Sequence, residues 1–160
     1  MATNFLYAAG TDGFIATPFN LQTTELNSLA NGNTVISSVN GTSGVFTQTN
    51  TASVVWAVIS FLAGGAFTPT TGGYIGGWFI LKADDSHFEK LVSNTAPPRS
   101  PDFTIPLFAS AYAANDISAC QGGLVRVPAC AFELLVQNSA GVSLPSSGNK
   151  IICGPVAVQY

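Results

Sequence analysis

The sequence predicts an all-β protein, a two-sheet antiparallel sandwich of jelly-roll or Greek-key type with an extended N-terminal arm. About seven to nine short segments rich in β-branched and aromatic residues follow one another, with connections of about 4 to 15 residues and hardly any helical period. Gly, Pro and Asn separate these segments. A length of 160 residues fits one domain. We therefore expect an arm at residues 1–20 and a single sandwich domain at 21–160.

The first twenty residues predict the arm. Phe5, Tyr7 and Phe14 are spaced among Gly, Thr and Asn without a helical period. We expect this arm to contact a neighbouring subunit and to become ordered there, so that proteases cut it first in the free protein.

The next stretch predicts short elements. Residues 21–30 carry only a weak amphipathic pattern, whereas 34–39 are β-branched and predict a strand. Asn40-Gly41 is a hairpin-type turn that would lead into a strand at 45–51.

Two strongly apolar segments, 52–62 and 73–81, predict the centre of the fold. The first is apolar on both faces, as in a strand covered on two sides. A buried helix is the competing interpretation, but β-branching and flanking glycines favour a strand. In the second segment, Gly76-Gly77 indicates a bulge or a close backbone approach. Both tryptophans, Trp56 and Trp78, lie here.

Residues 83–90 form a polar stretch whose side chains could hold a divalent cation or serve catalysis. The candidates are Asp84, Asp85, His87 and Glu89. The spacing lacks the glycine of a calcium loop, so a polar loop between strands is the simpler interpretation. A hydrolase could pair His87 with a serine or with Cys130, but a single histidine and few acids offer little material for such a site. We expect no enzyme activity, metal or cofactor.

Residues 96–107 contain four of the nine prolines and predict an extended edge or a rigid connection between sheets. This stretch is a candidate partner-binding strip, with Pro97, Pro98, Arg99 and Asp102 as its contact residues. A stiff crossover loop is the alternative, in which Arg99 and Asp102 form a local surface ion pair of small energetic value.

The C-terminal residues have the clearest pattern. Residues 123–128 lead into 131–138, where buried and polar positions alternate as in a half-buried strand. A turn at 138–141 and a longer loop at 142–149 precede a final strand at 150–160.

Composition limits the function classes. Only 8% of residues are charged and the mean hydropathy is +0.37, so apolar surface should be covered by a partner or a membrane. The longest apolar run, 52–67, is shorter than the ~20 residues of a spanning helix, which disfavours a membrane. Five basic residues and a net charge of -3 disfavour nucleic acid. The N-terminus has no basic region of a secretory signal.

Three cysteines, Cys120, Cys130 and Cys153, have neither an even number nor zinc-site spacing. We interpret them as free thiols in the core of a protein that folds in the cytosol.

Two stretches resemble a family of small virion proteins of tailed bacteriophages: 97–107, Pro-Pro-Arg-Ser-Pro-Asp-Phe-Thr-Ile-Pro-Leu, and 127–149, which ends Leu-Pro-Ser-Ser-Gly-Asn. The resemblance covers about 60 residues closely and the first 95 only in general character. Cys130 stands where the family commonly has Gly, and Ser146-Ser147 replaces Ala-Ser.

The resemblance implies a head decoration or cement protein with a β-sandwich or jelly-roll fold. Its expected partners are the phage major capsid protein and further copies of itself, as a dimer or trimer. The expected location is the outer capsid surface, after assembly in the host cytoplasm. The alternative is a tail-fibre or baseplate module that binds host carbohydrate through Tyr74, Trp56 or Trp78. Core packing is the simpler role for these aromatic residues, which have apolar neighbours.

Overall fold

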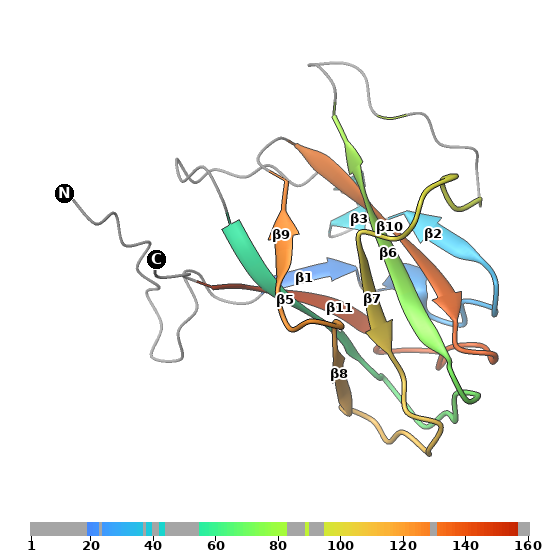
Figure 1. Ribbon diagram of the computed structural model, residues 1–160. Helices are drawn as coiled ribbons and strands as arrows, with labels where there is room; N and C mark the ends of the chain where they lie inside the picture. Colours follow the sequence, from blue (N-terminus) through green and yellow to red (C-terminus); the bar gives the residue numbers. More distant parts are fainter. Residues whose placement is uncertain are drawn as a thin grey trace.

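A computed structural model describes residues 19–22, 24–36, 38–39, 42–43, 55–82, 89, 95–128 and 131–156. In these ranges the regular secondary structure is almost entirely β-strand (Figure 1). The strands are β1 (Phe19–Gln22), β2 (Thr34–Ile36), β3 (Ser38–Val39), β4 (Thr42–Ser43), β5 (Val55–Leu62), β6 (Tyr74–Leu81), β7 (Phe103–Pro106), β8 (Ile117–Ala119), β9 (Val125–Val127), β10 (Phe132–Ser139) and β11 (Lys150–Val156). One 3-10 helix, η1 (Thr24–Leu26), is the part of the weakly amphipathic stretch that becomes helical.

The strands form two antiparallel sheets, which confirms the predicted sandwich. One sheet has the order β1-β11-β5-β8, with β9 also paired to β5, and the other has the order β2-β10-β6-β7. A separate antiparallel pair joins β3 to β4, so the chain pairs at 42–43, earlier than the expected partner strand at 45–51. The expected seven to nine strands are too few, because the described ranges contain eleven. The excess arises where an expected strand is divided, as in the β2–β3 stretch.

The two apolar segments form β5 and β6, which lie inside different sheets (Figure 1). On β5, Ala57, Ile59 and Phe61 are fully buried and face the core between the sheets. On β6 every residue from Ile75 to Ile80 is buried. Complete burial of a large apolar side chain contributes about 1.5–3 kcal/mol, so these strands supply much of the stabilisation of the sandwich.

Gly77 allows β6 and β7 to pack closely. Its backbone pairs with Phe103, and a Cβ atom at Gly77 would overlap the ring of Phe103. The pairing of β6 with β10 runs without a register shift from Tyr74 to Leu81, so there is no bulge. The glycine pair therefore marks a close approach, which was one of the two predicted alternatives.

The outer face of the β6 sheet is covered by the proline-rich segment. Trp78, Ile80 and Leu135 form a second buried cluster, against which Ala96 packs. The indole Nε1 of Trp78 donates to the backbone oxygen of Arg99 at 3.0 Å. β7 is an edge strand, as predicted, and the segment before it joins β6 to β7 within one sheet, not one sheet to the other.

Two buried asparagines fix the loop between β10 and β11. Asn138 Nδ2 donates to the carbonyl oxygens of Leu29 at 2.7 Å and Val142 at 2.8 Å. Asn149 Nδ2 donates to Pro145 O at 2.6 Å, and its Oδ1 accepts from Gly64 N at 3.1 Å. These contacts hold the loop to the η1 segment and to the end of β5.

The remaining expectations for chain segments lie partly outside the described residues. The arm with Phe5, Tyr7 and Phe14 and the strand expected at 45–51 are outside them. The last strand is described as far as Val156. Within the described ranges, no helix has the length and apolarity needed to cross a membrane.

Candidate functional site at the edge between the sheets

The site lies where β7 of one sheet faces β8 and β9 of the other. Near β8 the two sheets are joined, because Gln121 N donates to Thr104 O at 2.8 Å. The Thr104 hydroxyl also donates to Gln121 Oε1 at 3.3 Å. Gly122 and Gly123 then take positive φ angles of 86° and 78°, which divide β8 from β9. Beyond this turn the sheets separate.

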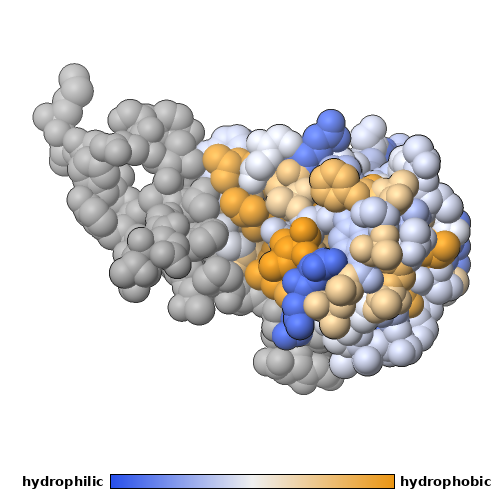
Figure 2. All heavy atoms as spheres, turned by 90° about the horizontal axis from the view of Figure 1, so that it is seen from below, coloured by the Kyte–Doolittle hydropathy of each residue, from blue (hydrophilic) through white to orange (hydrophobic). Residues whose placement is uncertain are grey.

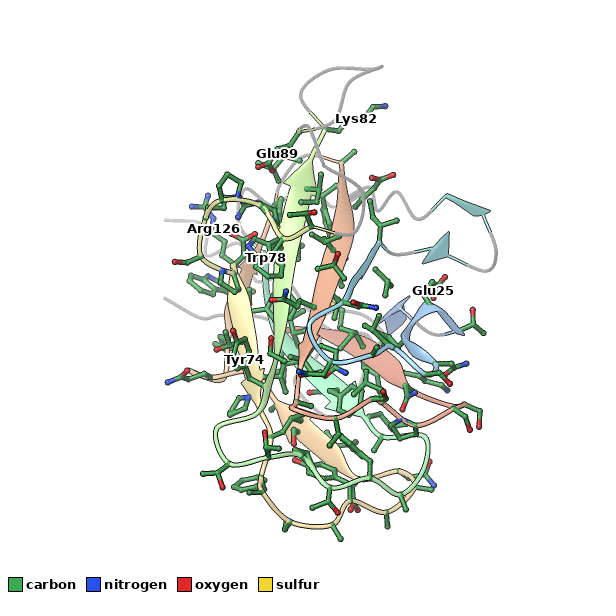
Figure 3. The ribbon with its side chains drawn as sticks, turned by 90° about the vertical axis from the view of Figure 1, so that its right-hand side faces the viewer. Glu25, Tyr74, Trp78, Lys82, Glu89 and Arg126 are labelled. Atoms are coloured by element: carbon green, nitrogen blue, oxygen red, sulfur yellow. The ribbon has the colours of Figure 1, made fainter. Side chains whose placement is uncertain are left out.

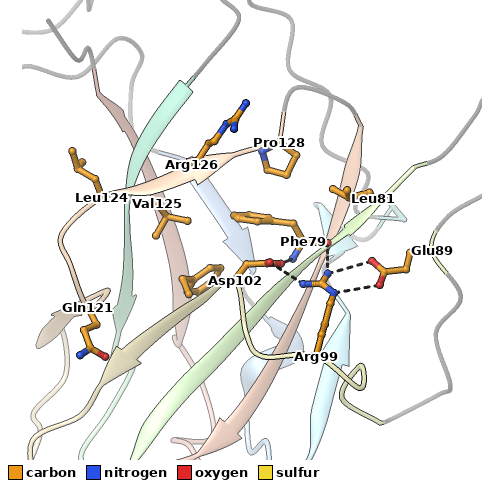
Figure 4. Close-up of a pocket in the computed structure, with 11 residues that line it drawn as sticks. Phe79, Leu81, Glu89, Arg99, Asp102, Gln121, Leu124, Val125, Arg126 and Pro128 are labelled. Atoms are coloured by element: carbon orange, nitrogen blue, oxygen red, sulfur yellow. Dashed lines mark hydrogen bonds and ion pairs between the residues drawn. The ribbon is translucent and has the colours of Figure 1, made fainter. Parts of the chain in front are cut away.

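A groove of about 890 Å³ opens between the separated sheets (Figure 4). Apolar side chains form much of its wall: Phe79, Leu81, Phe103, Leu124, Val125 and Pro128. Polar and charged side chains complete it: Glu89, Arg99, Asp102, Gln121 and Arg126. The groove thus combines apolar walls with charged side chains, a composition typical of binding sites.

Arg99 and Asp102 cap the exposed edge of β6 at Phe79. Asp102 Oδ2 accepts from Phe79 N at 2.7 Å, and Arg99 NH2 donates to Phe79 O at 2.9 Å. The same two side chains form an ion pair, with Arg99 NH1 2.8 Å from Asp102 Oδ1. The predicted ion pair is confirmed. Its hydrogen bonds also supply the backbone partners that an adjacent strand would provide, which the sequence did not indicate.

Glu89 completes this charged cluster. Its Oε2 lies 3.2 Å from Arg99 NH2, and its backbone N donates to Leu81 O at 2.8 Å. Partial burial alone would lower the pKa of Arg99, but the hydrogen bonds that its guanidinium donates to Glu89 and Asp102, together with the charges of these carboxylates, raise this pKa above its ordinary value. The guanidinium therefore stays charged, and it holds the end of β6 beside the start of β7.

The other expected site residues are only partly described. Pro97 is half-buried and Pro98 is exposed, on the segment that covers Trp78. Of the expected ion-binding residues only Glu89 is described, and it is paired with Arg99. The described residues contain no group of three His, Cys, Asp or Glu side chains able to hold a metal ion.

Sequence reasoning missed the β9 wall of the groove, with Leu124 and Arg126. Gly122-Gly123 was the available signal, since two adjacent glycines between apolar runs indicate a turn. The position of the strand that follows this turn depends on the pairing of β9 with β5, and no local sequence pattern gives that pairing.

Large apolar side chains are exposed at both ends of this edge. Leu81 and Leu124 are each 41% exposed at the groove. Phe108 on the β7–β8 loop is 74% exposed, and Ile117 at the start of β8 is 59% exposed. Figure 2 shows hydrophobic atoms beside hydrophilic ones on the face of the molecule seen from below. A protein with little charge thus presents apolar contact surface where the two sheets meet.

The aromatic residues proposed for carbohydrate differ in exposure. Tyr74 and Trp78 follow one another along β6, with Lys82 and Glu89 beyond its other end (Figure 3). Tyr74 is 36% exposed, whereas Trp78 is 3% exposed and packs in the second cluster. Core packing is confirmed for Trp78, so it offers no face for a sugar to stack on.

The described thiols are buried and free, as expected. Cys120 N donates to Ile59 O, and Cys153 pairs with Ile59 from the opposite side. Two strand spacings, about 9.5 Å, thus separate the two cysteines, beyond the ~7 Å limit for a disulfide. Burial, with the nearby Cys120, raises the pKa of Cys153 to about 12. Cys130 lies outside the described residues.

Comparisons with protein-family models, with curated proteins and with solved structures found no match to this chain.

Proposed function

We propose that this protein is a structural virion protein that binds the outside of a bacteriophage capsid and stabilises it, without catalysis. Its partners are the major capsid protein and further copies of itself, as a dimer or trimer. The proposal starts from the resemblance of residues 97–107 and 127–149 to tailed-phage decoration proteins.

The observation that carries the proposal is the exposed apolar surface around the groove. Leu81 and Leu124 are each 41% exposed at its rim, in a chain with only 8% charged residues. Exposed apolar surface gains free energy when a partner covers it, about 25 cal/mol for each Å² removed from water. A protein that lies on a shell needs such a surface and needs no reactive group.

The strand order supports the jelly-roll type. The first and last strands, β1 and β11, pair inside one sheet, and β2 and β10 pair inside the other. The order β1-β11-β5-β8 facing β2-β10-β6-β7, with β9 as an additional strand, supports an arrangement of two Greek keys. Jelly rolls occur in viral capsid and lectin domains, so the fold is compatible with the proposal and with its alternative.

The residues behind the resemblance have structural roles in this chain. Asn138 and Asn149 are buried and hydrogen-bonded, and Gly141 and Gly148 have φ angles of 81° and 77°. They build the loop between β10 and β11. The resemblance therefore supports the fold more directly than the role.

Sedimentation with phage heads tests the proposal. The gene for the major capsid protein is sought beside the gene for this chain, and heads assembled from it are mixed with the purified protein. We expect the protein to pellet with the heads at a fixed ratio and to raise their melting temperature. Protein that stays in the supernatant at saturating concentration contradicts the proposal.

A glycan array tests the carbohydrate alternative. Tyr74→Ala is the informative variant because Tyr74 is exposed, whereas Trp78→Ala would disturb the fold. A glycan signal that Tyr74→Ala abolishes would favour the alternative over capsid binding.

A further inference from the structure

The edge of the first sheet is closed at β8 and open at β9. Just after β8, Gln121 joins the edge to Thr104 of β7. β9 pairs with β5 through Ala57, Trp56 and Val55, and among the described strands it has no partner on its other side. That other side of β9 faces the groove in Figure 4. An unpaired strand edge is a template for a further strand.

On the opposite wall of the groove, the backbone groups at the outer edge of β6 are already engaged in hydrogen bonds. Along the outer edge of β6, Gly77 O accepts from Asp102 N at 2.8 Å and Leu81 O accepts from Glu89 N at 2.8 Å. Phe79 between them is occupied by Asp102 and Arg99. A strand entering the groove would therefore form its backbone hydrogen bonds with β9 and use the β6 wall for side-chain contact.

The alternating orientation of the side chains along β9 defines which residue types an added strand would have on each face. Val125 is buried and points inward opposite Ala57, while Arg126 is exposed and points outward opposite Trp56. Successive side chains of an added strand would alternate in the same way. Its inward side chains would meet Phe79 and Phe103, so they should be apolar.

The charge of Arg126 determines which outward-facing side chains would be favourable on the added strand. Arg126 makes no ion pair with any described residue, whereas Arg99 is engaged by Glu89 and Asp102. In Figure 4 its side chain points away from that charged cluster. An opposite charge on the neighbouring strand would face Arg126 directly and be favourable, and a like charge would be unfavourable.

We propose that β9 accepts an extended strand of alternating apolar and acidic residues, supplied by the partner protein, which lengthens the first sheet by β-augmentation. The inference rests on the proposed function, because the strand would belong to the capsid protein. Its site can nevertheless be tested without capsids.

The test uses blocked peptides of about seven residues. One alternates Val with Glu, and the other alternates Val with Lys. Each is titrated into the whole isotope-labelled protein while backbone amide signals are followed by NMR. We expect only the acidic peptide to shift the amides of Val125–Val127 and to slow their hydrogen exchange.

Reversal of one charge should exchange the preference. Arg126→Glu should bind the acidic peptide about fivefold more weakly and gain affinity for the basic one. Arg126→Gln should lose the preference without reversing it. Lys150→Glu is the matched control, since Lys150 pairs with Leu62 at the other end of β5 and should leave both affinities unchanged.

Three peptide-binding results would overturn the inference: equal binding of both peptides by the unaltered protein, shifts confined to β1 or β2, or no shift at β9 at millimolar peptide. Self-association that Arg126→Glu disperses would identify a second copy as the occupant and also overturn it. Peptide binding at β9 by a protein that ignores heads would contradict the proposed function alone. Head binding without a peptide response would contradict the β9 site alone.

Discussion

Phe79 donates its backbone N–H to Asp102 Oδ2 at 2.7 Å, although Asp102 belongs to no strand. β7 begins only at Phe103, so it pairs with β6 no further than Gly77. From there on, the side chains of Asp102 and Arg99 replace strand partners. The edge of β6 is thereby satisfied without a further strand, which limits unspecific edge-to-edge association at this position.

Asp102→Ala should lower the free energy of unfolding by about 1–3 kcal/mol, because Phe79 N loses its acceptor in a partly buried site. Urea denaturation measures the loss, and hydrogen exchange at Phe79 localises it. Asp116→Ala is a matched control: Asp116 Oδ2 also accepts from a backbone N, that of Ala113 at 2.8 Å, but in an exposed turn. Equal losses for both variants would refute the special role of Asp102.

Gly77→Ala should destabilise the protein by about 1–3 kcal/mol, because its methyl group would overlap the ring of Phe103. Thermal unfolding provides the measurement. Gly65→Ala is the control, since its Cβ would lie 3.5 Å from Pro145, an ordinary contact. The double variant Gly77→Ala/Phe103→Leu should lose less stability than the sum of the losses of the two single variants. Simple additivity would show that the ring is not the obstacle.

Asn138→Ala should cost about 3 kcal/mol or more, because Leu29 O, Val142 O and Ala140 N would lose their buried partner. Calorimetry should show a lower melting temperature with the loop between β10 and β11 loosened. Gln137→Ala, next along the strand, removes an exposed hydrogen bond to Gly32 O and a long one, 3.5 Å, from Ser139 Oγ, and should change stability by less than about 0.5 kcal/mol. A small effect at both positions would contradict the role assigned to Asn138.

Stability should fall as the pH rises from about 9 to about 12. The folded protein keeps the proton on Cys153, whose pKa is raised to about 12, while the unfolded chain loses it near the ordinary value of 9.0. The stabilisation is thus complete below pH 9, and it decreases by at most about 1.4 kcal/mol per pH unit within that window. Cys153→Ala should show a shallower decrease in urea titrations over the same range. Parallel curves for both proteins would contradict a buried, protonated thiol.

The sequence predicted the sandwich because its signals are local. The β-branched residues of β5, the apolar run of β6 and the alternation in β10 each identify a strand without knowledge of its partners. The Gly76-Gly77 pair likewise indicated a bulge or a close approach, although neither which of the two occurs nor that Phe103 is the neighbour.

The charged cluster could not be predicted in the same way. Arg99 and Asp102 are three positions apart, so their ion pair is foreseeable, but their contacts with Phe79 join residues at least twenty positions apart. The groove also depends on contacts between residues far apart in the sequence. It arises where β9, after Gly122-Gly123, separates from β7 of the other sheet. Trp78 was foreseeable as a core residue from its apolar neighbours, but its cover, the segment before β7, was not.

Cryo-electron microscopy of phage heads incubated with this protein tests the central claim most directly. The account predicts additional density of sandwich shape at regular positions on the outer surface, absent from heads alone. Heads that stay bare at saturating protein, or density confined to a tail, would contradict it.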